Sequence, residues 1–204
     1  MNQVISLNQT TIHAWASGQY QKAVEHYFKL ANFTTEKMAD GTRLHDEWKN
    51  HIKATNTLPD AFGGGKLNNP IPERKYIVKL QDWLELYGTP DCIDSPIIYE
   101  FKSGTRSSES YASSWQTRIY AVLATYPGIY IEDEKEFKHE GIFVDRAIIH
   151  HFDQYLKKHD TSQLWITDEV LQEAYNYIET IAGEMYQYFE QNDLWNKFGH
   201  NLKK

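Results

Sequence analysis

The segment of residues 86–104, LYGTPDCIDSPIIYEFKSG, constrains the fold more than any other part of the chain. An apolar run ends at Gly88, a tight polar loop carries Asp91, and a second apolar run then brings Glu100 and Lys102 two residues apart. Residues i and i+2 of a strand point the same way, so this acid and this lysine share one face. Burying charges costs several kcal/mol unless they are paired or bind a metal, so the arrangement requires a reason.

Pairing of the two apolar runs as a hairpin around the residues CIDSP would bring Asp91 close to Glu100. Two neighbouring carboxylates raise each other's pKa unless a cation lies between them. Oxygen ligands suit Mg²⁺ or Mn²⁺, and such an ion polarises a phosphoryl oxygen and lowers the pKa of bound water. Lys102 would then position the attacking water or balance negative charge on a phosphate. The acid-x-lysine pattern alone favours a plainer alternative, a structural salt bridge at a strand edge with Asp91 stabilising the turn.

The length and composition of the chain are those of one soluble globular domain. Its 204 residues are enough to bury about 70% of the surface that the unfolded chain exposes. No run approaches the roughly 18 apolar residues of a transmembrane helix, and the N-terminus lacks the basic-then-apolar pattern of a signal peptide, so we expect a cytoplasmic protein. The single cysteine, Cys92, excludes an internal disulfide and any all-cysteine zinc or iron–sulfur site within one chain.

The charges are unevenly distributed along the chain. The net charge of −7, taken alone, argues against a nucleic-acid binder. Residues 159–196, however, hold eight acids and no lysine or arginine, so the remainder of the chain sums to +1. Residues 43–79 hold seven bases against four acids. Either these charges are scattered and only solvate the surface, or a mildly basic working face lies opposite an acidic helix.

Hydrophobic periodicity divides the chain into helices and strands in mixed order. The expected elements, in chain order, are helices at 9–31 and 41–54, strands within 76–88 and at 96–104, a helix at 114–126, a strand at 141–149 within the segment 129–150, and a helix at 167–191 with Thr167 as its N-cap. Residues 55–75, which contain three prolines and a glycine triplet, are expected to form a long loop. This order predicts an α/β protein in which helices flank a mixed central β-sheet.

Two of the expected helices add polar side chains that could reach the same site. Gln116 and Tyr120 are four residues apart on one helix face, and such a pair can hold a lysine or a phosphate by hydrogen bonds. A tyrosine at this spacing is more often part of a core. His45 lies on the second expected helix, and His51 is six residues away and off the same face, so the two do not form a zinc pair of the i,i+4 kind.

Two other patterns carry no site of their own. The residues FGGGK at 62–66 lack the spacing of a phosphate-binding P-loop, and a flap near the site with Lys66 touching a phosphate is the better interpretation. His150 and His151 would point to opposite faces of a strand, which makes them a poor metal pair.

The ordered set GTRLH, YGTPD, YEFKSG and QTRIY, with the opening helix before it, resembles the PD-(D/E)XK nuclease superfamily, specifically its RecB-like exonuclease branch. That branch includes helicase-linked nuclease domains, phage exonucleases and CRISPR adaptation nucleases. The resemblance spans about residues 7–150. It implies a restriction-endonuclease-like fold in which one domain, residues 1–204, comprises N-terminal helices (9–54), a catalytic core (75–150) and a C-terminal helix (167–191).

The resemblance also implies a role for each matching residue. His45, Asp91, Glu100 and the backbone carbonyl of Phe101 would bind Mg²⁺ or Mn²⁺. The catalytic residues would be Asp91, Glu100, Lys102, Gln116 and Tyr120. Apart from the resemblance, the residues expected to contact nucleic acid are Arg43, Lys66, Arg106, Tyr111 and Arg118. Some relatives carry cysteines for an iron–sulfur cluster, but ASGQ stands here where a Cys-Pro pair often lies, so we expect no cluster.

These features together predict metal-dependent hydrolysis of phosphodiester bonds in DNA. The expected enzyme is an exonuclease of DNA recombination, DNA repair or phage DNA processing that acts on single-stranded or duplex ends, without a membrane partner. A homo-oligomer and a helicase or recombination partner both stay open. The alternative is a catalytically inactive module of nuclease fold that binds nucleic acid or another protein. RNA as substrate also stays open, because a metal site does not read the 2′-hydroxyl.

Overall fold

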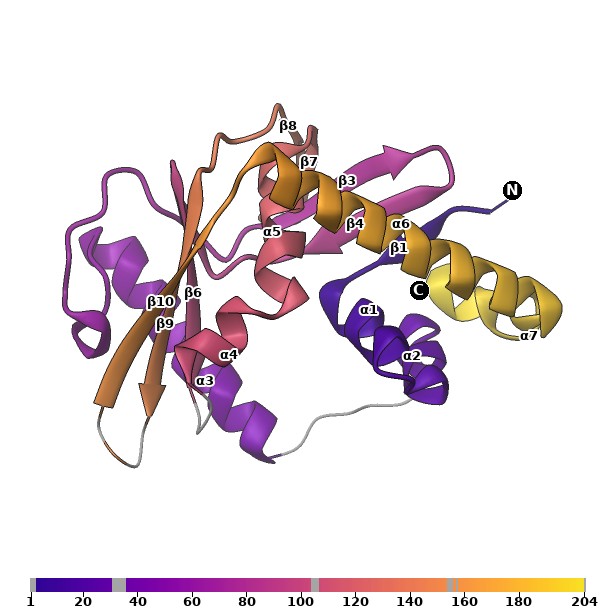
Figure 1. The fold of residues 1–204 in the computed structure, drawn as a ribbon, viewed down its shortest axis with the longest axis horizontal. Coiled ribbons are helices and arrows are strands. Elements are labelled where there is room, and N and C mark those ends of the chain that lie inside the picture. The colour runs from indigo at the N-terminus through magenta and orange to yellow at the C-terminus, as the bar shows by residue number, and fades with distance from the viewer. Residues whose placement is uncertain (1–2, 31–35, 104–106, 154–155, 157, 204) are drawn as a thin grey trace.

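The computed structural model describes residues 3–30, 36–103, 107–153, 156 and 158–203, which form two five-stranded sheets surrounded by helices (Figure 1). The first sheet has the strand order β1 (Ile5–Leu7), β4 (Leu84–Gly88), β3 (Lys75–Gln81), β7 (Gly128–Glu132) and β8 (Lys135–His139). The second has the order β10 (Lys158–Trp165), β9 (Arg146–Asp153), β6 (Ile97–Ser103), β5 (Cys92–Asp94) and β2 (Ile71–Pro72). The pairs β1–β4 and β6–β9 are parallel and the other described pairs are antiparallel. The expected α/β class with mixed strands is therefore confirmed, and the strands divide between two sheets.

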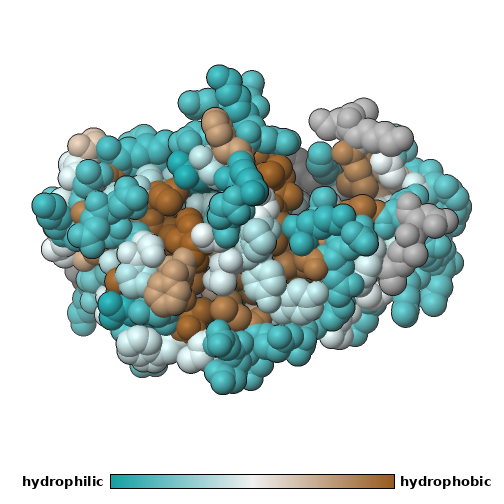
Figure 2. Space-filling model, turned by 90° about the horizontal axis from the view of Figure 1, so that it is seen from above, coloured by the Kyte–Doolittle hydropathy of each residue, from teal (hydrophilic) through white to brown (hydrophobic). Residues whose placement is uncertain are grey.

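The helices lie on both sides of these sheets. They are α1 (Gln9–Ala16), α2 (Tyr20–Tyr27), α3 (Glu36–Thr55), the 3₁₀ turn η1 (Asp60–Phe62), α4 (Ser108–Ala112), α5 (Trp115–Thr125), α6 (Asp168–Gln191), α7 (Leu194–Phe198) and the 3₁₀ turn η2 (Gly199–Lys203). Among the described residues, none of the helices has both the length and the apolar character needed to cross a membrane. The face seen from above is mostly hydrophilic, with hydrophobic residues visible in patches near its centre (Figure 2).

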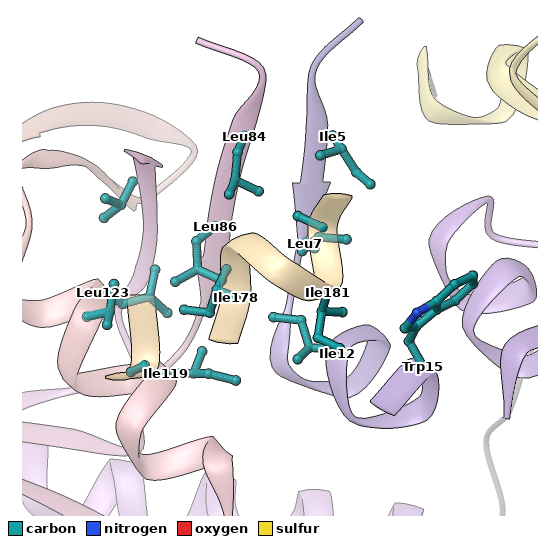
Figure 3. Close-up of a cluster of buried hydrophobic side chains, with 14 of the residues drawn as sticks. Ile5, Leu7, Ile12, Trp15, Leu84, Leu86, Ile119, Leu123, Ile178 and Ile181 are labelled. Carbon is teal, nitrogen blue, oxygen red and sulfur yellow. The ribbon is translucent and has the colours of Figure 1, made fainter. Parts of the chain in front are cut away.

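The larger core lies between the first sheet and the helices α1, α5 and α6. Leu84 and Leu86 of β4 and Ile178 of α6 are fully buried there. Figure 3 shows side chains of β1, β4, α1, α5 and α6 meeting in this cluster. The apolar stripe of α6 therefore packs the core. Thr167 caps this helix as expected, because its hydroxyl accepts a hydrogen bond from the Val170 N–H at 3.4 Å.

A smaller core lies between the second sheet and α3. Trp48 and Ile52 of α3 pack there with Tyr99 and Phe101 of β6 and with Phe62 of η1. The opposite face of β6 carries Ile98, which belongs to the larger core, followed by Glu100 and Lys102. Strand β6 thus separates an apolar layer from a charged layer, and α5 lies on the charged side (Figure 1).

The prediction of one continuous helix at 9–31 is wrong, because the structure has two helices there, α1 and α2. Gly18 has a left-handed φ of +76°, its N–H donates to Trp15 O, and the Gln19 N–H donates to Ala14 O. These two hydrogen bonds form a Schellman motif, which ends a helix at a glycine. Residue 31, the last of the expected helix, lies outside the described residues.

Other boundaries also differ from the expectation. The expected strand at 141–149 starts only at Arg146, and the hairpin β7–β8 precedes it. The Ile142 N–H instead donates to Ala124 O at the end of α5, which holds this segment away from the sheet. Strand β10 and the short helix α4 were not predicted. The expected loop at 55–75 holds η1, β2 and one isolated bridge between Thr57 and Lys66.

Candidate active site

The candidate site lies at the open end of the β5–β6 hairpin. The register pairs Cys92 with Tyr99 and Asp94 with Ile97. The expected hairpin between the two apolar runs is wrong in its first strand, because β4 pairs with β1 and β3 in the other sheet and the short strand β5 takes its place beside β6. Asp91 immediately precedes β5, at the point where the chain leaves the first sheet for the second. The hairpin therefore brings Asp91 beside the charged face of β6.

Both oxygens of Asp91 have neighbours that fix the carboxylate. Oδ2 accepts a hydrogen bond of 2.7 Å from the Phe101 N–H, and Oδ1 lies 3.4 Å from His45 Nδ1 on α3. Burial alone would raise the pKa of Asp91, but the charge of Lys102 and the hydrogen bonds from His45 and Phe101 lower it below its ordinary value. Asp91 is therefore held ionised in a buried position.

Glu100 carries the least compensated charge of the site. Its side chain is fully buried, Oε2 accepts a 2.9 Å hydrogen bond from Lys102 Nζ, and Oε1 has no hydrogen-bond partner among the described residues. Burial raises the pKa of Glu100 to about 7, although the charge of Lys102 acts in the opposite direction. A buried oxygen without a partner is rare in folded proteins and requires an explanation.

Lys102 stays protonated in this environment. Burial lowers its pKa, but the charges of Glu100 and Asp91 outweigh burial and raise the pKa of Lys102 to about 12. The ammonium group also lies 5.9 Å from the ring centre of Tyr111 on α4. Lys102 is therefore a hydrogen-bond donor and a fixed positive charge, and it is a poor proton acceptor.

The Gln116–Tyr120 pair of α5 lies beside the carboxylates. Gln116 Nε2 donates a 3.3 Å hydrogen bond to the Tyr120 hydroxyl. Burial raises the pKa of Tyr120, and the charges of Glu100 and Asp91 raise it further, so this hydroxyl is close enough to sense both acids. The expected one-face arrangement of the pair is confirmed, and its catalytic role stays a prediction.

His45 reaches the site from α3, on the other side of the hairpin. Burial lowers its pKa, but the hydrogen bond to Asp91 and the charge of Asp91 raise it above the ordinary value of a histidine. Phe101 contributes its N–H to Asp91, and its ring stacks on Phe62 in the smaller core at a centroid distance of 5.0 Å. Its carbonyl as a metal ligand stays a prediction.

The residues expected to contact nucleic acid are spread more widely. Arg43 is exposed on α3 and pairs with Glu47 at 2.6 Å, and Lys66 is exposed in the loop. Arg118 donates to the Ala112 and Ser114 carbonyl oxygens, so this guanidinium ties α5 to the end of α4. Arg106 lies outside the described residues. Only Tyr111 of this set lies next to Lys102 in the described part of the chain.

The donors of the site suit a hard divalent cation in kind. Within the described ranges, no three side chains of His, Cys, Asp or Glu converge closely enough to hold a metal ion. The unpartnered, fully buried Oε1 of Glu100 and the neighbouring Asp91 nevertheless offer the carboxylate oxygens that Mg²⁺ and Mn²⁺ prefer. The site therefore fits such an ion by its donor chemistry, with His45 as a nitrogen donor beside it.

One cluster near the site was missed by the sequence analysis. His151 of β9 pairs with Lys102 in the parallel register, and its Nδ1 lies 2.6 Å from Asp160 Oδ1 on β10. The other Asp160 oxygen accepts a 2.8 Å hydrogen bond from the Ser108 N–H at the start of α4. This cluster anchors the helix that carries Tyr111. His150 contacts the opposite face with Tyr99 and Phe101, which confirms the expected divergence of the two histidines.

Asp94, at the turn end of the β5–β6 hairpin, has a structural role. Its carboxylate accepts hydrogen bonds from the Asn68 and Asn69 N–H groups at 2.9 and 2.7 Å. Asp94 therefore anchors the long loop at the turn end of the hairpin, away from the open end that carries Asp91.

Comparisons with known proteins place this architecture among solved structures. No protein-family model matches the chain, and no curated protein matches it in sequence. An alkaline exonuclease (LHK-Exo) from Laribacter hongkongensis superposes with a TM-score of 0.55 and 8% identity, over 96% of this chain and 95% of that chain. The same exonuclease in complex with dAMP gives 0.55 and 10%, over 94% and 92%. The protein SSO0001 gives 0.51 and 11%, over 89% of this chain and 76% of that chain. At these identities the likeness shows a shared fold: the chain has the fold of an alkaline exonuclease.

Proposed function

We propose that the chain is a nuclease of the PD-(D/E)XK superfamily, in its RecB-like branch, that hydrolyses phosphodiester bonds in DNA with Mg²⁺ or Mn²⁺. The observation that carries this proposal is the buried group of Asp91, Glu100 and Lys102, in which one oxygen of Glu100 has no partner. Such a group destabilises the fold unless a ligand completes it. The fold shared with an alkaline exonuclease supports the proposal.

The proposed metal ligands are Asp91, Glu100, His45 and the carbonyl of Phe101. A bound Mg²⁺ or Mn²⁺ polarises a phosphoryl oxygen and lowers the pKa of water. The hydrogen bond from the Phe101 N–H fixes one oxygen of Asp91 and thereby sets the direction of the other. In this proposal the Glu100 oxygen that lacks a hydrogen-bond partner is the oxygen that would coordinate the metal ion.

Lys102 acts as a donor in the proposed reaction. Because its pKa is raised to about 12, it keeps its proton at neutral pH and presents positive charge to a phosphate oxygen. Gln116 and Tyr120 orient the substrate or the lysine from α5. In the hydrolysis, the oxygen of a water molecule bonds to phosphorus while the bond from phosphorus to the leaving sugar oxygen breaks, and that oxygen takes up a proton.

We further propose that the enzyme is an exonuclease acting in DNA recombination, DNA repair or phage DNA processing. The complex of the alkaline exonuclease with dAMP, a mononucleotide, supports an activity that releases single nucleotides from an end.

The test compares linear with circular DNA. End-labelled linear single- and double-stranded DNA and a closed circle are incubated with the protein in Mg²⁺, Mn²⁺ or EDTA. Metal-dependent loss of the linear substrates alone is the expected result. Nicking of the circle would keep the chemistry and change the class to endonuclease, whereas cleavage in EDTA would contradict the metal requirement.

A second candidate function is a binding module of nuclease fold without catalysis. The observation that favours it is that no three metal-binding side chains converge within the described residues. Calorimetric titration with Mn²⁺ separates the two candidates. The nuclease binds Mn²⁺ in a manner that Asp91→Ala abolishes, while the binding module gives the same titration for the wild type and the variant.

A further inference from the structure

A cavity of about 220 Å³ lies between α1 and the segment α4–α5, next to the candidate site. Gln9, Ile12 and His13 of α1 line one side of it, and Tyr111, Trp115 and Gln116 line the other. Pockets for drug-sized ligands usually measure about 300–1,000 Å³, so this cavity suits a single small planar group. None of the residues from α1 has a role in the proposed metal site.

Two residues connect the cavity to the candidate site. Gln116 lines the cavity and also donates to the Tyr120 hydroxyl, which senses the charges of Glu100 and Asp91. Tyr111 lines the cavity and lies 5.9 Å from Lys102 Nζ. When a substrate phosphate lies at Lys102, the nucleoside attached to that phosphate can therefore reach the cavity.

The lining combines an aromatic ring with side chains that both donate and accept hydrogen bonds. Trp115 stacks on Tyr177 at 3.9 Å with an interplanar angle of 7°, so one of its faces is already used in the fold. The ring of Tyr111 lies 6.1 Å from that of His151 at an angle of 35°, without the close stacking of Trp115, and it is partly exposed, so a ligand in the cavity can contact it. The amides of Gln9 and Gln116 and the imidazole of His13 can pair with the edge of a nucleobase.

We propose that this cavity binds the unpaired base of the nucleotide at the end of the DNA substrate. The base contacts the ring of Tyr111, and its edge faces Gln9 and His13. This inference rests on the proposed nuclease function and narrows its substrate to DNA whose terminal base is free of its partner strand. Bases stack on aromatic side chains in many single-strand-binding sites, and such stacking is sequence-tolerant.

The experiment measures binding in EDTA, so that cleavage does not enter. Single-stranded oligonucleotides carry a normal base or an abasic residue at the 5′ or the 3′ terminus, and a third set carries 2-aminopurine there as a fluorescent reporter of stacking. The proteins are the wild type, Tyr111→Leu, the double variant Gln9→Ala/His13→Ala, and the control Gln21→Ala. Gln21 is an exposed glutamine of α2 that does not line the cavity.

We expect the wild type to bind the oligonucleotide with a terminal base about tenfold more tightly than the abasic one at one of the two ends, a difference of about 1.4 kcal/mol. The 2-aminopurine fluorescence should fall on binding. Tyr111→Leu and the double variant should lose this preference while their circular dichroism spectra stay those of the wild type, and Gln21→Ala should keep it.

Equal affinities of the wild type for oligonucleotides with and without the terminal base, at both ends, would overturn the inference. A cleavage assay in Mg²⁺ then tells which proposal failed. Cleavage of linear DNA that Glu100→Gln abolishes would leave the nuclease proposal intact and remove the base pocket alone. A folded wild type that cleaves no DNA would remove the nuclease function, while the binding data would still decide the pocket.

Discussion

One face of strand β4, in the first sheet, and one face of strand β6, in the second, bury different kinds of side chain. The face of β4 that meets α6 buries only apolar side chains, such as Leu84 and Leu86 against Ile178. The charged face of β6 buries Glu100 fully and Lys102 largely, and one Glu100 oxygen has no hydrogen-bond partner among the described residues. The first face stabilises the fold by removing apolar surface from water. The second buries charge, which costs free energy unless the charges are paired or bind a ligand, and the proposed function rests on this face.

The largest effect on stability is expected in the apolar layer. Ile178→Ala removes a fully buried side chain from the contact of α6 with β4, which should lower the free energy of unfolding by about 2–5 kcal/mol. Urea denaturation followed by circular dichroism measures this change. The matched variant Ile148→Ala, at a partly buried position beside the smaller core, should cost less. An equal loss for both would contradict the assignment of the main core.

The charged layer should behave in the opposite way. The double variant Glu100→Leu/Lys102→Met replaces an ion pair that is largely buried with apolar side chains of similar size, which is typically neutral or stabilising by about 1–4 kcal/mol. We therefore expect the double variant to be at least as stable as the wild type toward urea. The single variant Lys102→Met leaves Glu100 without its partner and should be less stable than the double variant. A strongly destabilised double variant would mean that the pair exists to hold the fold together.

The pH dependence of stability should distinguish the two layers as well. The pKa of Glu100 is raised from 4.5 to about 7, so the folded state keeps a proton that the unfolded state has lost between these two pH values. The contribution of Glu100 to the free energy of unfolding is therefore fully present below pH 4.5 and is lost as the pH rises toward 7. The loss is on the order of 1 kcal/mol for each unit by which the pKa is raised.

A difference curve is needed to see this effect. Burial lowers the pKa of His150 to about 4, so the stability that this histidine contributes rises with pH over the same range. Subtracting the unfolding free energies of Glu100→Gln from those of the wild type removes the contribution of His150 and keeps Lys102, which lowers the pKa of Asp91. We expect the difference to fall between pH 4.5 and 7 in metal-free buffer. A flat difference would show that Glu100 titrates normally.

The smallest effect concerns the start of α6. Thr167→Ala removes the hydroxyl that accepts from the Val170 N–H and should cost about 1 kcal/mol. The control Thr180→Ala lies on an exposed position inside the same helix, where alanine is the better helix former, and should not destabilise the protein. Thermal unfolding of both variants measures the difference, and a loss as large in Thr180→Ala would refute the cap.

The elements predicted best from the sequence were those with a strong local signal. The spacing of Glu100 and Lys102 on an apolar strand, the turn before that strand, and the cap at Thr167 each depend on a few neighbouring residues, and the structure has all of them. The break at Gly18 was missed because the apolar pattern continues across it, while the Schellman motif depends on backbone conformation.

Strand β10 could not be predicted because its sequence, KHDTSQLW, has little apolar alternation. It lies at the edge of the second sheet and is held by its hydrogen bonds to β9. Its Asp160, and with it the link from His151 to α4, was therefore missed. The approach of His45 to Asp91 likewise depends on how α3 packs against the hairpin, and only the family resemblance indicated it.

The most direct test of the central claim is the rate at which linear DNA is degraded in Mg²⁺ by the wild type and by Glu100→Gln, with Glu190→Gln as a matched control on the exposed surface of α6. Removing one group that stabilises a transition state typically costs about 10²–10³-fold in rate. We predict a loss of at least this size for Glu100→Gln, with the fold intact and the rate of Glu190→Gln unchanged. Equal rates for the wild type and Glu100→Gln would contradict the assignment of this site as the nuclease centre.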